Sequence, residues 1–316
     1  MLLACSDTPA PERDAGSDTT TSDTSAADMI AADTSERDTS STDVLIPDVP
    51  VVQPDPELWY SVDTMLVHIA MDASDGSVME LHTSELSTAL PVGQNGLTVL
   101  EDGSLFGSRL SADTNLTTLY LIESPPRDGS TANVSVLGLM PDDLMLEGLY
   151  SDCEGRVYAM DTGADATNSE GNRLLRFTGD VRAGELAYVV VSELGTADVA
   201  DIDDMGPGIR DNTITDNPGL AIDSGAIHDF DYESGSGTQV GTGGSYGIHA
   251  LGGALFDDGR ARLFVFSIDA DLFELDPESF EASEALIRGP MPAEGIAGWS
   301  GLAGPLTECE SGFELI

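Results

Sequence analysis

The sequence predicts an all-β fold built from repeated modules, and three observations support this. After residue 57, short runs rich in β-branched and aromatic residues alternate with Gly, Asp, Asn and Pro. An acidic turn motif ending in glycine recurs at Gly103, Gly155 and Gly259, which are separated by 52 and 104 residues. Residues 58–316 have room for about five units of that length. We therefore expect a five-bladed β-propeller, with six blades or a β-sandwich as the alternatives.

The expected strands each carry apolar or β-branched residues between turn residues. They are Met65–Met71, Val78–Leu81, Leu97–Leu100, Leu105–Ser108, Thr117–Ile122, Val134–Leu137, Arg156–Met160, Arg173–Phe177, Tyr188–Val191, Leu263–Ser267, Leu272–Leu275 and Ile296–Leu302. Pro277–Leu286 is the one candidate for a short helix, and residues 198–245 match the repeat poorly, which keeps six blades open. The segment Gly298–Leu302 is expected to close the ring by pairing with strands from residues 58–88.

The segment before this body has a different composition. Aspartate recurs every five residues from Asp18 to Asp48, a period that matches neither a helix nor a strand. Thirteen acidic residues face two arginines up to residue 57. Since like charges repel and few apolar groups are present, residues 6–57 are predicted to form a disordered acidic linker.

The first residues, Leu2-Leu3-Ala4-Cys5, resemble the lipobox of Gram-negative bacterial lipoproteins. The resemblance implies that residues 1–5 are the remnant of a lipoprotein signal, that Cys5 is lipidated, and that translation starts upstream of Met1. It also implies an outer-membrane lipoprotein that faces the periplasm or the cell surface, with the linker as its tether. The alternative is an apolar start with an unmodified cysteine.

The charge balance narrows the classes of partner. The chain has 57 acidic residues, 12 arginines and no lysine, for a formal net charge of −45. Phosphate backbones need clustered cations, so the composition argues against a nucleic-acid-binding protein. It also argues against electrostatic adsorption to anionic lipid. The membrane is expected as a partner only through the lipid anchor.

Two kinds of site follow from residue type and spacing. With Cys5 lipidated, Cys153 and Cys309 are candidates for a disulfide in an oxidising compartment, the alternative being two separate thiols. The loop 161–172 contains Asp161, Asp165 and Glu170, oxygen ligands of the kind that calcium takes. The alternative is an ordinary solvated acidic loop.

Residues 144–177, which contain Glu147-Gly148-Leu149, resemble a blade of esterase-like phytases and gluconolactonase-type propellers. The resemblance implies a calcium-dependent hydrolase, an esterase, lactonase or phytase-like enzyme, in which Glu147, Asp161 and Asp223 are the acids of first interest. The acidic body would repel a polyanionic substrate.

The residues themselves favour a function without catalysis. The sequence contains no His-Glu-x-x-His motif. Its one Gly-x-Ser-x-Gly match, Gly243–Gly247, lies in a glycine-rich run that lacks the preceding strand and following helix of a nucleophile elbow, so we interpret it as a surface loop. We therefore expect a binding or scaffold module, with an unknown protein or small molecule as its ligand, and we leave the hydrolase as the alternative.

Overall fold

The structure is a computed structural model that describes residues 55–152, 154–161, 173–193, 202–210, 213–223, 225–243, 247–256, 259–267, 271–283 and 301–305. All of them belong to the compact unit Val52–Ile316. In these ranges the chain is β-strand and turn, with two single-turn 3-10 helices, η1 (Pro141–Asp143) and η2 (Val181–Ala183). No helix of the described residues is both long and apolar enough to span a bilayer.

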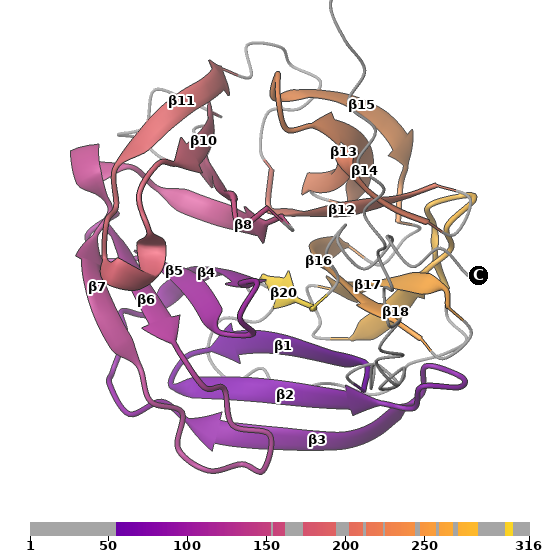
Figure 1. Ribbon diagram of the computed structural model, residues 1–316, viewed down its shortest axis with the longest axis horizontal. Helices are drawn as coiled ribbons and strands as arrows, with labels where there is room; N and C mark the ends of the chain where they lie inside the picture. The colour runs from indigo at the N-terminus through magenta and orange to yellow at the C-terminus, as the bar shows by residue number, and fades with distance from the viewer. Residues whose placement is uncertain are drawn as a thin grey trace, which may run out of the picture. The chain divides into compact units, whose positions relative to one another are not determined.

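The strands form five four-stranded antiparallel sheets, or blades (Figure 1). From the innermost strand outward, blade 1 is β20 (Leu302–Ala303), β1 (Glu57–Val62), β2 (Met65–Met71) and β3 (Val78–Glu85). Blade 2 is β4 (Gly93–Val99), β5 (Leu105–Ser111), β6 (Thr117–Ile122) and β7 (Ser135–Leu139). Blade 3 is β8 (Leu146–Ser151), β9 (Val157–Asp161), β10 (Arg173–Phe177) and β11 (Tyr188–Glu193).

The last two blades complete the set. Blade 4 is β12 (Asp204–Arg210), β13 (Thr213–Asp223), β14 (Ala226–Asp231) and β15 (Ser236–Gly241). Blade 5 is β16 (Ile248–Leu255), β17 (Ala261–Ser267), β18 (Leu272–Leu275) and β19 (Ala282–Ser283). Each innermost strand contacts the innermost strand of the next blade, and β16 and β4 both contact β20. The ring therefore closes, which confirms the predicted propeller with five blades and excludes the six-bladed and sandwich alternatives.

The closing strand that was predicted at Gly298–Leu302 is confirmed at Leu302, whereas residues 298–300 lie outside the described residues. Strand β20 pairs antiparallel with β1, with Leu302 opposite Tyr60 and Ala303 opposite Trp59. Both ends of the propeller's chain thus share one sheet, so the innermost strand of blade 1 comes from the far end of the sequence. This pairing leaves β1 with a hydrogen-bonded neighbour on each side.

The glycines of the predicted repeat occupy equivalent turns. Gly103, Gly155 and Gly259 follow the innermost strands of blades 2, 3 and 5, with φ of 79°, 75° and 73°. Each N–H donates to the carbonyl oxygen three residues earlier, on Leu100, Asp152 and Phe256. A residue with a side chain is strained at such a positive φ, which explains why the repeat carries glycine there.

A second set of glycines packs the axis, one from the innermost strand or its flank in each blade: Gly96, Gly148, Gly206, Gly252 and Gly301. A Cβ on Gly96 would lie 2.1 Å from the Glu147 oxygen, and one on Gly252 would lie 2.8 Å from the Leu302 oxygen. Because each glycine faces the next blade, the five innermost strands approach one another more closely than side chains would allow.

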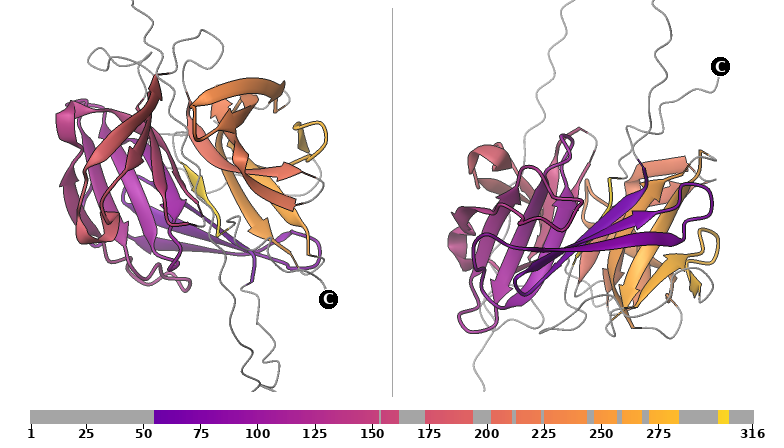
Figure 2. Two further views of the ribbon diagram at one scale, coloured as in Figure 1. Left: turned by 45° about the horizontal axis from the view of Figure 1, so that its top comes forward. Right: turned by 90° about the horizontal axis from the view of Figure 1, so that it is seen from below.

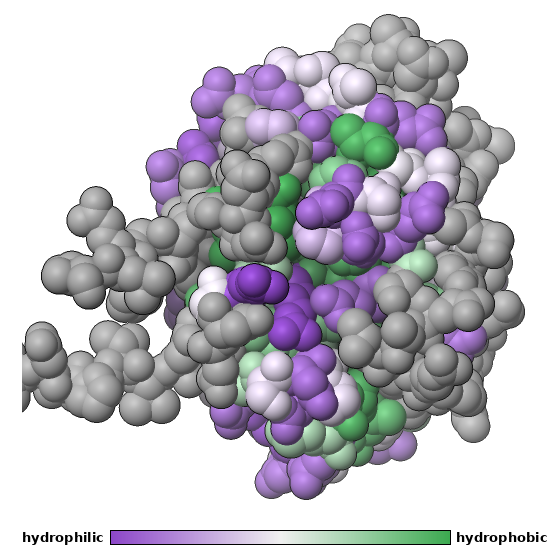
Figure 3. Space-filling model, turned by 90° about the vertical axis from the view of Figure 1, so that its right-hand side faces the viewer, coloured by the Kyte–Doolittle hydropathy of each residue, from purple (hydrophilic) through white to green (hydrophobic). Residues whose placement is uncertain are grey.

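The buried apolar residues lie between neighbouring blades. One cluster joins blades 1 and 5 through Tyr60, Val67, Phe264 and Phe266, with the Tyr60 and Phe266 rings 4.8 Å apart. The sheets stand around the ring (Figure 2), and neighbouring sheets pack face to face through these clusters. Hydrophobic and hydrophilic residues alternate on the side of β17 and β18 (Figure 3). The most exposed large apolar side chains lie in blades 1 to 3 and the β3–β4 link: Met79, Leu81, Val92, Val136, Leu139, Val189 and Val190.

The strand predictions can be compared directly with these elements. Four match their strands from end to end: Met65–Met71, Thr117–Ile122, Arg173–Phe177 and Leu272–Leu275. The short helix expected at Pro277–Leu286 is wrong as far as residue 283, because this part contains a turn at 277–279 and then β19. Residues 198–245 contain blade 4, whose second strand is 11 residues long and carries a register shift, so it departs from the repeat.

Candidate functional site

The cysteines lie outside the described residues. This holds for Cys5, Cys153 and Cys309. The linker up to residue 54 and the loop residues Asp165 and Glu170 also lie outside the described residues. Lipidation at Cys5 and a Cys153–Cys309 disulfide therefore stay predictions.

The described members of the predicted calcium set lie at one end of the propeller, which we call the start face because the innermost strands begin there. Glu147 is the second residue of β8, and Asp161 ends β9 opposite Leu146. Asp223 ends β13, next to Ile222, which pairs with Asp204 at the beginning of β12. Glu147 and Asp161 thus belong to blade 3, and Asp223 to blade 4.

Asp161 is fully buried and already holds a cation. Its Oδ2 accepts hydrogen bonds from Arg173 Nε at 3.0 Å and Nη2 at 2.7 Å, and its Oδ1 accepts one from the Met145 N–H at 3.2 Å. Its oxygens therefore orient Arg173 and the chain entering β8. Within the part of the chain that the structure describes, no group of three or more His, Cys, Asp or Glu side chains is placed to hold a metal ion.

Asp204 is an acid of this face that was not among the predicted calcium ligands, although it ends the acid-rich segment 198–204. It has no exposed surface, and its Oδ2 accepts hydrogen bonds from the Leu251 N–H at 2.9 Å and the Leu302 N–H at 3.2 Å. Its Oδ1 accepts one from the Met205 N–H at 2.9 Å. Burial raises the pKa of this carboxyl well above its usual range, against the opposing effect of the three backbone hydrogen bonds. Asp204 therefore ties β12, β16 and β20 together at the axis.

The axial channel itself is almost filled. All five innermost strands or their flanks line it, through residues such as Thr98, Ser151, Met205, Gly252 and Ala303, and its volume is about 20 Å³. A cavity needs roughly 10–15 Å³ to hold one water molecule. The channel has space for about one water, so an organic substrate does not fit on the axis.

A larger cavity opens at the opposite end, the end face, where the innermost strands finish. It lies between blades 2 and 3 and has a volume of about 210 Å³, and we call it the blade 2–3 cavity. Its apolar walls are Leu100, Val157, Phe177 and Val181. These residues belong to the apolar cluster between the two blades, so the cavity opens from that cluster.

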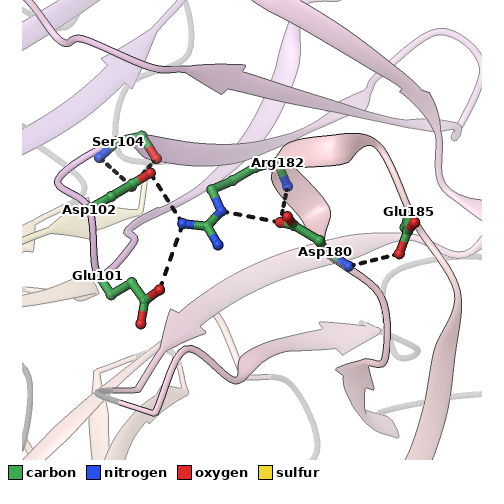
Figure 4. Close-up of polar contacts among 6 residues, drawn as sticks. All are labelled: Glu101, Asp102, Ser104, Asp180, Arg182 and Glu185. Atoms are coloured by element: carbon green, nitrogen blue, oxygen red, sulfur yellow. Dashed lines mark hydrogen bonds and ion pairs between the residues drawn. The ribbon is translucent and has the colours of Figure 1, made fainter.

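The rim of this cavity is ionic (Figure 4). Arg182, on η2 of blade 3, reaches toward the β4–β5 turn of blade 2. Its guanidinium nitrogens lie 3.1 Å from Asp180, 3.3 Å from Asp102 and 3.7 Å from Glu101. The Asp180 N–H donates to Glu185 Oε2, and Asp180 Oδ1 accepts from the Arg182 N–H. One cation thus stands among four carboxylates at the junction of two blades.

Ser151 is the buried polar group of the cavity wall. It ends β8 opposite Val157, so the two side chains lie on one face of the sheet, and both line the cavity. Its N–H donates to Thr98 Oγ1 at 3.0 Å. Only 2% of the residue is exposed, and within the described residues its hydroxyl has no hydrogen-bond partner. Such a hydroxyl is costly to bury unless a ligand or a water satisfies it.

The sequence contained one signal for this second site. The turns that hold Gly103 and Gly155 are equivalent by the 52-residue repeat, and the cavity is lined by Glu101 from the first and Gly155 from the second. The repeat thus predicts that the two turns are neighbours on one face. Ser151 and Arg182 carry no motif, and only the packing of the blades brings them together.

Comparisons with known proteins were made for the whole chain. No protein-family model matches it, and no curated protein shows significant similarity. Among solved structures, it is similar to virginiamycin B lyase from Staphylococcus aureus, with 18% identity, 77% of this chain and 76% of that chain covered, and a TM-score of 0.36. It is also similar to a chain of the nidogen/laminin complex, with 10% identity, 80% and 100% covered, and a TM-score of 0.42. A protein of unknown function from Bacteroides caccae gives 14% identity, 77% and 76% covered, and a TM-score of 0.38. Similarity at this level carries no conclusion about function.

Proposed function

We propose that this chain is an extracytoplasmic lipoprotein, tethered to the outer membrane through Cys5, whose propeller binds a ligand without transforming it. The observation that carries the binding role is the contrast between the axis of the ring and its end face. At the axis the channel volume is about 20 Å³, whereas the blade 2–3 cavity on the end face has about 210 Å³ and a buried hydroxyl in its wall. Among the described residues, the blade 2–3 cavity thus combines room for a small molecule with a buried hydroxyl that has no protein partner.

Two acids of the start face, Asp204 and Asp161, support the same reading, because their oxygens bind groups of the protein. Asp204 accepts three backbone N–H groups, and Asp161 accepts Arg173 and the Met145 N–H. A general acid or base has to exchange a proton with a substrate at hydrogen-bond distance. Carboxylates held in this way serve to position strands.

A calcium-dependent hydrolase is the second candidate, and one observation favours it. Leu146, which precedes Glu147, pairs with Asp161, so two acids of the predicted set are neighbours on blade 3. In this alternative Glu147, Asp161 and Asp223, with Asp165 and Glu170, would provide oxygen ligands for calcium, which takes six to eight.

One experiment separates the two candidates. The soluble propeller is incubated with a panel of single-ring esters, lactones and their hydrolysis products, with and without millimolar calcium, and proton NMR follows both ligand saturation transfer and product formation. The binding proposal expects saturation transfer without turnover and no calcium-dependent rise in the melting temperature. Turnover that requires calcium and is lost in Asp161→Asn would overturn it.

The tether is tested independently. The full chain is expressed in a Gram-negative host behind a lipoprotein signal peptide, and a palmitate analogue is used for metabolic labelling. We expect the label on the wild-type chain and none on Cys5→Ser, with the label moving the protein into the outer-membrane fraction. Equal labelling of Cys5→Ser rejects the anchor.

A further inference from the structure

We infer that the blade 2–3 cavity is a site for a small organic cation, a protonated amine on an apolar body about the size of one aromatic ring. This inference rests on the proposed binding function and names the ligand chemistry of its site. It is carried by the size of the cavity, its apolar walls, the buried Ser151 hydroxyl and the carboxylates of the rim.

The size of the cavity limits the apolar body. Its volume is about 210 Å³, and an engineered apolar cavity of about 150 Å³ takes one benzene molecule. A single ring with a short substituent therefore fits, whereas two fused rings with substituents do not. Leu100, Val157, Phe177 and Val181 offer the ring apolar contacts, and Phe177 also packs edge to face against Phe106, with centroids 5.6 Å apart.

The Ser151 hydroxyl supplies a polar anchor at the wall. It is 2% exposed and without a hydrogen-bond partner among the described residues, although its own N–H is satisfied by Thr98. A hydroxyl can donate one hydrogen bond and accept two. It can therefore accept an N–H of an ammonium group, which recovers the cost of burying it.

The charge of the rim selects the sign of the ligand. Glu101 and Asp180 line the cavity with Arg182, and Asp102 and Glu185 stand behind them. Arg182 already lies near three carboxylates, so an anionic ligand would have to compete with them for the guanidinium. Four carboxylates against one guanidinium leave a local excess of negative charge. An ammonium group is attracted there, and a carboxylate is repelled.

Three size-matched probes test this chemistry. Benzylamine, benzyl alcohol and benzoate share one ring and one substituent, and they differ in charge at neutral pH. Binding is followed by chemical-shift changes of labelled methyl groups, which locate the probe at Leu100, Val157 and Val181. We expect benzylamine to bind about threefold to tenfold more tightly than benzyl alcohol, the range that one or two exposed charge pairs provide. Benzoate is expected not to bind.

Variants assign the selectivity to named groups. Glu101→Gln should remove most of the preference for benzylamine and leave the affinity of benzyl alcohol unchanged. Ser151→Ala should weaken both probes. Glu154→Gln is the matched control, since this exposed glutamate lies on the same face but does not line the cavity, and it should leave both affinities unchanged. High salt should weaken benzylamine alone.

The outcomes are distinguishable. Benzoate or benzyl alcohol binding at these methyl groups at least as tightly as benzylamine overturns the ligand chemistry and leaves the binding function standing. If Glu154→Gln lowers benzylamine affinity as much as Glu101→Gln does, the attraction comes from net charge and the site is rejected. If none of the probes shifts the cavity methyl groups, the cavity is not the binding site and the proposed function fails with it.

Discussion

The two interfaces that flank blade 2 both contain an apolar cluster, but they differ in where their arginine lies. Between blades 1 and 2, Arg109 is 1% exposed and donates to Ser61 Oγ at 3.0 Å, the Asp63 oxygen at 3.0 Å and the Pro91 oxygen at 3.1 Å. Between blades 2 and 3 the contact is apolar, Arg182 stays at the rim, and a cavity remains. The first interface encloses a buried arginine, hydrogen-bonded to protein groups, beside its apolar cluster, whereas the second leaves its arginine at the surface and keeps a cavity.

A second polar group strengthens the blade 1–2 interface. Glu57 of β1 accepts hydrogen bonds from His68 of β2 at 2.9 Å and from Arg127 of the β6–β7 connection at 2.5 and 2.6 Å. Arg127 also lies 5.5 Å from the Trp59 ring centroid. The comparison teaches that buried charge can hold two blades together where all its partners are provided by protein. The ligand site that we propose lies where a buried hydroxyl, that of Ser151, has no partner among the described residues.

The largest expected effect is that of Arg109→Ala. The change leaves the oxygen atoms of Ser61, Asp63 and Pro91 without the donor that Arg109 provides. It should therefore lower the free energy of unfolding by about 3–5 kcal/mol. Chemical denaturation of the soluble propeller measures it. Arg109→Lys keeps the charge but reaches fewer acceptors, so it should lose roughly half as much. An Arg109→Ala variant as stable as the wild type would break the comparison.

Glu57→Gln should have the next largest effect and depend on pH. Burial alone would raise the pKa of Glu57, but the hydrogen bonds from His68 and Arg127 outweigh it and lower the pKa to about 2. A depressed pKa stabilises the fold above the ordinary value near 4.5, and this contribution is lost as the pH falls toward 2. At pH 7 the variant should be about 2–3 kcal/mol less stable than the wild type.

The pH series provides the control for Glu57. Because the chain carries many other acids, both proteins will lose stability in acid, and the difference between them is the quantity to follow. We expect that difference to shrink between pH 5 and pH 2. A gap that stays constant over this range would show that the charge of Glu57 does not contribute.

A pair of glycine variants sharpens the comparison at the axis and the rim of blade 2. Gly96→Ala places a Cβ 2.1 Å from the Glu147 oxygen of blade 3, so it should cost about 2–3 kcal/mol through overpacking. Gly103→Ala has open space but a φ of 79°, so it should cost only about 1 kcal/mol. Thermal unfolding ranks the two. If Gly103→Ala proves the more damaging, close approach at the axis is not what the Gly96 position requires.

The smallest effect should be that of Arg182→Gln. The guanidinium is at the surface, and exposed ion pairs contribute little to stability. We expect a melting temperature close to that of the wild type, in contrast to Arg109→Ala. This result would show that Arg182 contributes little to the stability of the blade 2–3 interface. A destabilisation as large as that of Arg109→Ala would show that both interfaces depend on arginine in the same way.

The fold could be predicted further than the site. The spacing of Gly103, Gly155 and Gly259 revealed the repeat, because a turn that requires a positive φ favours glycine at that position. Blade 4 was missed for the opposite reason, since its long second strand and register shift break the spacing. Asp204 could not be found among 57 acids, because its position at the axis depends on three strands that are far apart in the sequence.

The pairing of β20 with β1 has a consequence for how the molecule is made. Strand β1 ends at Val62, and its inner partner Leu302 is added about 240 residues later. At a synthesis rate of 5–20 residues per second, this leaves blade 1 without its inner strand for roughly 12–50 seconds. The inner edge of β1 therefore stays open during synthesis, and the ring can close only after β20 has left the ribosome.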